Sequence, residues 1–131
     1  MPKLFKIVLC SASFLWASGA IANPADLVGS EWGFDKPVEQ FITFSDKGQV
    51  SGHAGCNRFF GSFSIEKHKS RINIGPLAST KKACEQSVMK AESSFLKKLE
   101  TTQTYKRNAR SLDLFDESGA LLLSLAWRDF D

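Results

Sequence analysis

The sequence predicts an α+β domain: a curled antiparallel sheet, or a partly open β-barrel, of about seven or eight short strands covered by one helix. Short aromatic-rich or alternating segments, separated by turn residues, recur along most of the chain. A single stretch at about 85–99 has the periodicity of a helix instead. No internal repeat or linker divides the 131 residues, so we expect one domain with one core.

The first 22 residues have the three parts of a secretory signal peptide. Lys3 and Lys6 form a positive start, an uncharged, mostly apolar stretch follows, and Ala20-Ile21-Ala22 is a cleavage site of the small-x-small kind. The apolar stretch is shorter than the ~20 residues of a membrane span. The alternative is a buried N-terminal helix. We therefore expect a signal peptide over 1–22 and a single mature domain over 23–131, exported to the periplasm without a stable membrane anchor.

The charge balance argues against a nucleic-acid partner. The full chain has 17 basic and 14 acidic residues, and because Lys3 and Lys6 lie in the leader, the mature part has 15 against 14. The remaining basic residues occur as short pairs separated by acidic ones, which is typical of a solvated surface of mixed sign. A nucleic-acid site would instead gather basic and aromatic residues on one face.

Strand patterns begin soon after the leader. Residues 41–44 and 49–52 flank a glycine-containing turn and predict a hairpin. A second aromatic-rich strand is expected at 58–65. A third, at 71–74, is predicted to end at Gly75-Pro76.

The stretch from Glu85 to Leu99 differs from its surroundings in its period. Apolar residues recur at i, i+3, i+7 and i+11, and charged residues fall between them. This pattern predicts an amphipathic helix of about four turns. The expected packing face is Val88, Ala91, Phe95 and Leu99, and the expected solvent side contains Lys90, Glu92, Lys97 and Lys98.

After the helix, the strand pattern returns to the end of the chain. Residues 102–106, 111–115 and 120–127 are each short and rich in apolar or β-branched residues. Polar turns at 107–110 and 116–119 separate them. The tail is therefore expected to be an antiparallel meander.

Two cysteines, Cys56 and Cys84, remain once the leader is removed. An even number of cysteines in an exported protein favours a disulfide between them. Such a bridge would join the glycine-rich segment to the chain just ahead of the helix and would stabilise the fold by about 3 to 4 kcal/mol on the chain-entropy model. The alternative is two separate buried thiols, each acting as a small apolar residue.

The residues around both cysteines resemble a known family. The motif Gly52-x-x-Gly55-Cys56-Asn57-x-x-x-Gly61-x-Phe63 is followed by Leu77-Ala78-Ser79-Thr80-x-x-Ala83-Cys84, and Leu27-x-Gly29-x-x-Trp32 precedes them. In this order and spacing they resemble the META domain (DUF306), the family of the bacterial heat-shock protein HslJ. The resemblance covers about 27–127 and departs from the family pattern at Lys82, where Met is usual.

That resemblance implies a compact β-barrel-like α+β fold in the bacterial envelope, linked to heat-shock or antibiotic stress. It implies no agreed activity, and a fold by itself does not establish chemistry. From it we expect a secreted, single-domain member of the family, and we expect the protein to be a monomer.

Three functions remain open. The first is a non-enzymatic envelope protein that acts in stress response by contacting an unknown protein partner. The second is a carrier that encloses a small apolar ligand, as barrels of about eight strands can. The third, least favoured, is a thiol-dependent enzyme using Cys56 with His53 as base. We expect no catalytic residues, no cofactor and no metal site, because no nucleophile, base and orienting group can be placed together.

The residues that follow Cys56 have two possible roles each. The Asn57 side chain either bonds nearby backbone and fixes the turn, or contacts a ligand. Alternation along the strand places Phe59 and Phe63 on the core face. Phe60 then points to the other face, as a sheet-covering residue or as part of an exposed apolar patch.

Overall fold

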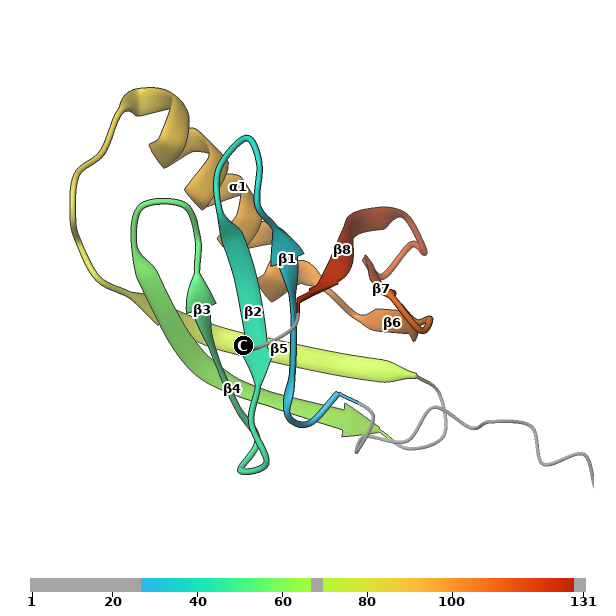
Figure 1. Cartoon of the computed structure of the whole chain (residues 1–131). Coiled ribbons are helices and arrows are strands. Elements are labelled where there is room, and N and C mark those ends of the chain that lie inside the picture. Colours follow the sequence, from blue (N-terminus) through green and yellow to red (C-terminus); the bar gives the residue numbers. More distant parts are fainter. Residues whose placement is uncertain (1–26, 67–69, 129–131) are drawn as a thin grey trace, which may run out of the picture.

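The computed structural model describes residues 27–66 and 70–128, which form a ring-like antiparallel sheet with one helix (Figure 1). The predicted signal peptide lies outside the described residues. The α+β prediction, with a curled sheet of about eight strands and one helix, is confirmed. The elements are β1 (Ser30–Phe34), β2 (Gln40–Phe44), β3 (Gln49–His53), β4 (Arg58–Glu66), β5 (Arg71–Ser79), α1 (Gln86–Thr101), β6 (Thr104–Arg107), β7 (Ser111–Phe115) and β8 (Leu121–Arg128).

Each strand pairs with the next one along the chain, and β1 pairs with β8 to close the ring. At that closure Trp32 lies opposite Trp127, with the two rings in a T-shaped contact. The join between β5 and β6 is the shortest, with only Arg71 opposite Thr104 in register. The helix α1 lies alongside β5 where that strand has left its β6 neighbour (Figure 1).

The core fills the inside of the ring. Its largest fully buried side chains come from seven of the described strands, the helix and the segment before β1, and they include Trp32, Phe44, Phe59, Ile42, Ile74, Phe95 and Leu99. Phe59 of β4 meets Phe95 of α1 edge to face, with ring centroids 6.0 Å apart. The helix is therefore part of the core and not a separate surface layer.

The first hairpin, β2–β3, forms as predicted, and β1 lies where the family resemblance placed an opening strand. The prediction that the strand after Arg71 ends at Gly75-Pro76 is wrong, because β5 continues to Ser79. Gly61 pairs with Leu77 and Phe63 with Ile74, so Ser62 faces two residues, Gly75 and Pro76, in a β-bulge. In the described structure, β5 pairs only with β4 beyond Arg71, so this part of β5 is an edge. Pro76 has no backbone N–H, and proline is tolerated in a bulge at such an edge.

The helix begins and ends close to its predicted bounds, at Gln86 and Thr101. The expected strand at 102–106 starts later, at Thr104, because Thr102 caps the helix. The Thr102 backbone N–H donates to the Leu99 carbonyl, and the Thr102 hydroxyl donates to the Lys98 carbonyl. Thr102 is fully buried, and these two bonds satisfy its donors.

Candidate functional site

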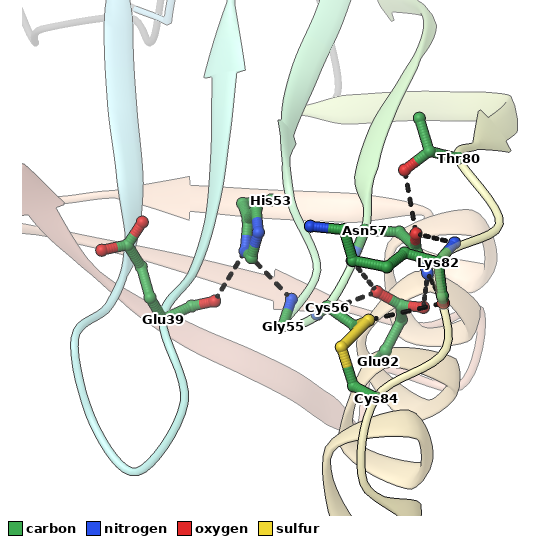
Figure 2. The surroundings of a disulfide bond; sticks show 9 residues. All are labelled: Glu39, His53, Gly55, Cys56, Asn57, Thr80, Lys82, Cys84 and Glu92. Carbon is green, nitrogen blue, oxygen red and sulfur yellow. Dashed lines mark hydrogen bonds between the residues drawn. A yellow bond between two sulfur atoms is a disulfide. The ribbon is translucent and has the colours of Figure 1, made fainter.

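Most of the predicted motif residues meet where the turn between β3 and β4 approaches the start of α1 (Figure 2). Three parts of the chain form this site: the turn Ala54–Asn57, the extended connector of residues 80–85 between β5 and α1, and Glu92 on the helix. They are far apart in the sequence, and side-chain bonds hold them together.

The turn is narrow and depends on two glycines. Gly55 has φ +127°, a backbone conformation that side chains rarely adopt, and a Cβ there would lie 3.1 Å from Val38. Gly52, one residue before the end of β3, lies under the Phe59 ring, where a Cβ would be 2.8 Å from ring carbons. Behind them the Ala54 N–H donates to the Asn57 carbonyl at 2.9 Å. The glycines thus let the turn pass between the core and the helix.

Cys56 and Cys84 form the disulfide that the sequence favoured, with their Cα atoms 6.0 Å apart. It ties the turn to the connector just before α1 (Figure 2). The two cysteines differ in environment: Cys56 is only 7% exposed, whereas Cys84 lies in a run of exposed residues. In this state neither sulfur is a thiol, so the structure offers no nucleophile at Cys56.

Glu92 is the residue that the sequence interpretation placed wrongly. It was assigned to the solvent side of the helix, but it is only 4% exposed and points at the turn (Figure 2). Its carboxylate accepts the backbone N–H of Cys56 at 3.1 Å and that of Asn57 at 2.6 Å. It also accepts the side-chain amide of Asn57 at 2.8 Å. Three donors thus satisfy a carboxylate that would otherwise be costly to bury.

These contacts set the ionisation of Glu92. Burial alone raises the pKa of a carboxyl group, but here the hydrogen bonds from the Asn57 side chain and from the Asn57 and Cys56 backbone outweigh it. The nearby charge of His53 acts in the same direction. The pKa of Glu92 therefore lies below its ordinary value of 4.5, and the group is a carboxylate at neutral pH.

Asn57 bonds both the helix and the connector. Its amide nitrogen donates to the Lys82 carbonyl at 3.0 Å, and its amide oxygen accepts the Lys82 N–H at 2.6 Å and the Thr80 hydroxyl at 2.9 Å. The side chain does bond backbone, but the prediction that this backbone is nearby in the chain was wrong, because the partner Lys82 is 25 residues away. With Glu92 included, both ends of the amide are bonded, so Asn57 has a structural role here.

The other motif residues lie apart from this site. Gly61 and Phe63 are in β4, and Phe63 packs on Phe44 with ring centroids 5.0 Å apart. Lys82 stands where the family usually has Met, and its side chain is exposed and makes no core contact. Its backbone bonds the Asn57 side chain. Phe59 is buried and Phe60 is 56% exposed, as the strand alternation predicted.

His53 does not face the sulfur of Cys56 in a base-like arrangement. Its Nδ1 lies 3.2 Å from the Glu39 carbonyl and 3.3 Å from the Gly55 backbone nitrogen, and its ring stacks on Phe41. Among residues 27–66 and 70–128, no group of His, Cys, Asp and Glu has the geometry to hold a metal ion. Over the same residues, no helix has the length and apolar character needed to span a membrane.

A signal for Glu92 was present in the sequence. Glu92 lies four residues after Val88, three before Phe95 and seven before Leu99, which puts it on the apolar stripe of the helix. A carboxylate at such a position is buried only where donors meet it. The donors come from a turn more than thirty residues earlier, and helical periodicity carries no information about that contact.

Comparisons with known proteins agree with this fold. An NMR structure of a protein from Burkholderia xenovorans is 22% identical, with a TM-score of 0.67, and the match covers 82% of this chain and 90% of that one. A crystal structure of a DUF4847 family protein from Bacteroides vulgatus is 15% identical, with a TM-score of 0.62 and coverages of 80% and 96%. No curated protein matches the chain.

At these identities the two structures show a shared fold and nothing about activity. The sequence itself gives a more specific result, because the family model of the META domain matches residues 25–128. That match includes the described strands, the helix and both cysteines of the disulfide. The chain therefore belongs to the META domain family.

Proposed function

We propose that this protein is a non-enzymatic periplasmic protein that acts in the stress response of the bacterial envelope by binding a protein partner. The leader pattern supports export, and a disulfide suits an oxidising compartment. The proposed partner surface is the outer face of β3, β4 and β5 around Phe60. The observation that carries the proposal is the exposure of this phenylalanine.

Phe60 is 56% exposed, although it lies in the middle of a well-paired strand. Its cross-strand neighbours on the outer face are small, Ser51 on β3 and Ala78 on β5. The ring therefore stands above its surroundings. An exposed aromatic ring on a rigid sheet is the kind of anchor that dominates protein interfaces.

The surface next to Phe60 also suits a protein contact. An open hollow beside it is lined by the polar side chains Ser45, Gln49, Ser51 and Ser62, together with Pro76. No charged residue lines it. An apolar anchor with polar groups at its edge resembles a protein interface, whose buried core is depleted of charged residues and whose rim is polar.

The carrier alternative is less well supported. The largest described side chains of the inner face, Trp32, Phe44 and Phe59, are fully buried, and each packs on another aromatic ring: Trp127, Phe63 and Phe95 of the helix, respectively. A ligand inside the ring would have to displace these packed groups, and overfilling a packed core typically costs about 1 to 3 kcal/mol. We therefore favour an external contact over an enclosed ligand.

Site-specific crosslinking tests the proposed surface. A photo-crosslinking residue replaces Phe60 in one variant and Leu121 in another; Leu121 is 57% exposed on β8, outside the proposed face. Both variants are exported in cells under heat stress and irradiated. We expect a discrete crosslinked protein from position 60 that is absent from position 121, and weaker capture of it when Phe60→Ser is combined with a crosslinker at Ser62.

Two outcomes would contradict the proposal. Equal crosslinking from both positions would mean that exposed apolar residues are captured without specificity. Absence of any product at position 60, with the variant folded and exported, would mean that this face binds no protein under heat stress. Urea denaturation of each variant, compared with that of the wild-type protein, checks that the fold is intact.

A further inference from the structure

We propose that the Cys56–Cys84 disulfide is a reversible thiol-exchange site, entered through Cys84, and that its chemical partner is a dithiol such as the active site of an oxidoreductase. This goes beyond the partner surface around Phe60, which lies on β4 and includes neither cysteine. Three observations carry it: the unequal exposure of the two cysteines, the connector around Cys84, and the bonds that remain when the disulfide opens.

The two cysteines of the disulfide differ in their exposure to solvent. Thiol exchange requires a thiolate to reach one sulfur of the bond directly. Cys56 is 7% exposed and lies under the connector, with its sulfur 3.4 Å from the Lys82 carbonyl. Cys84 is exposed, as are its neighbours in the connector. Access therefore directs the incoming thiolate to Cys84.

The charges around Cys84 also favour this approach. Lys81 and Lys82 precede Cys84 and Glu85 follows it, all three exposed, so the segment has a net positive charge. An incoming thiolate is an anion, and nearby cations raise its local concentration. The turn around Cys56, in contrast, carries the Glu92 carboxylate, which accepts the Cys56 N–H at 3.1 Å.

The reaction has two steps. In the first, the thiolate forms a bond to the Cys84 sulfur, the Cys56–Cys84 bond breaks, and the electron pair goes to Cys56, which takes a proton from water. In the second, the second thiolate of the dithiol attacks the partner's own sulfur in the mixed disulfide and releases Cys84 as a thiolate. The partner is oxidised to a disulfide by two electrons and this protein is reduced to two cysteines.

Cys56, and not Cys84, is the sulfur that leaves in the first step, because the burial of Cys56 blocks attack at its own sulfur. The released Cys56 thiol can donate to the Lys82 carbonyl, which already lies 3.4 Å from its sulfur.

The connector stays in place after reduction. Asn57 bonds the Lys82 backbone at 2.6 and 3.0 Å and the Thr80 hydroxyl at 2.9 Å, and none of these bonds involves sulfur. The two thiols therefore remain near each other in a folded protein. That proximity favours re-formation of the same disulfide when the reductant is removed.

The experiment uses the mature wild-type protein and a small anionic monothiol, 2-mercaptoethanesulfonate, as the probe. After partial reaction under native conditions, acid stops exchange, an alkylating reagent labels free thiols, and peptide mass spectrometry locates the adduct. We expect the mixed disulfide on Cys84 and the free, alkylated thiol on Cys56. The fully reduced protein should keep its near-ultraviolet circular dichroism.

Other results would overturn the proposal. An adduct mainly on Cys56 would show that burial does not direct the attack. Exchange only at urea concentrations that unfold the protein would show a purely structural disulfide. Loss of the near-ultraviolet signal on reduction would show that the Asn57 bonds do not hold the connector. None of these outcomes depends on whether Phe60 binds a partner.

Discussion

Replacing Glu92 by Gln tests the central contact of the site. The side chain keeps its size but loses its charge, and one of its two oxygens becomes an amide nitrogen. In the wild type the Asn57 amide nitrogen donates to Oε2 of Glu92 at 2.8 Å. If the new amide nitrogen takes the place of Oε2, two hydrogen-bond donors face each other. Asn57 cannot rotate to relieve this, because its oxygen accepts bonds from Lys82 and Thr80.

The expected loss of stability follows from those bonds. Hydrogen bonds to a charged group typically contribute about 1.5 to 3 kcal/mol each. The substitution weakens the two bonds from the Cys56 and Asn57 backbone and removes the bond from the Asn57 side chain. We expect Glu92→Gln to lower the free energy of unfolding by roughly 2 to 3 kcal/mol, measured by urea denaturation with an unchanged m-value. The matched control is Glu100→Gln on the same helix, which is exposed and should change stability by less than about 0.5 kcal/mol.

The effect should depend on pH in a defined direction. The folded-state pKa of Glu92 lies below its ordinary value of 4.5, so its contribution is fully present above that pH and is lost as pH falls through the folded-state pKa. The stability difference between wild type and Glu92→Gln should therefore be constant near neutral pH and narrow in acid. Equal stabilities of the Glu92 and Glu100 variants at pH 7 would refute the reasoning.

Three further predictions concern the core, the disulfide and the leader. Phe95→Ala should cost roughly 3 to 5 kcal/mol because Phe95 is buried, whereas Lys97→Ala should stay within about 0.5 kcal/mol in the same denaturation assay. Cys56→Ser and Cys84→Ser should each lower the free energy of unfolding by about 2 to 5 kcal/mol. The double variant should lose little more, because each substitution removes the same disulfide. Two free thiols in the unreduced, denatured protein would contradict this pairing. N-terminal sequencing of the exported protein should begin at Asn23, and a sequence beginning at the initiator methionine would contradict cleavage.

Local patterns in the sequence predicted most of the architecture. The hairpin β2–β3, the strand β7 and the helix α1 each follow from a period of 2 or 3.6 within one short segment. The alternation around Phe59 and Phe60 assigned the correct faces for the same reason. These features depend on neighbours in the chain, which the sequence displays directly.

Features that depend on distant partners were predicted less well. Gly75-Pro76 looks like a strand end because each residue disfavours regular pairing, yet β5 continues through both in a bulge opposite Ser62 of β4. The burial of Glu92 depends on N–H groups of the β3–β4 turn. Neither partner can be identified from the local sequence, so the site was found in part, through its cysteines and Asn57, while its carboxylate was missed.

The position of the site explains why the turn is held in two ways. The ring of strands is weakest where β5 leaves β6, and α1 lies there and contributes Phe95 and Leu99 to the core. The first half of the helix therefore needs an attachment to the sheet that does not come from strand pairing. Glu92 provides it at the β3–β4 turn, and the disulfide joins that turn to the connector before the helix. Since the carboxylate and Asn57 bonds do not involve sulfur, opening the disulfide removes one attachment and leaves the other, so exposed Cys84 can exchange thiols without releasing the helix.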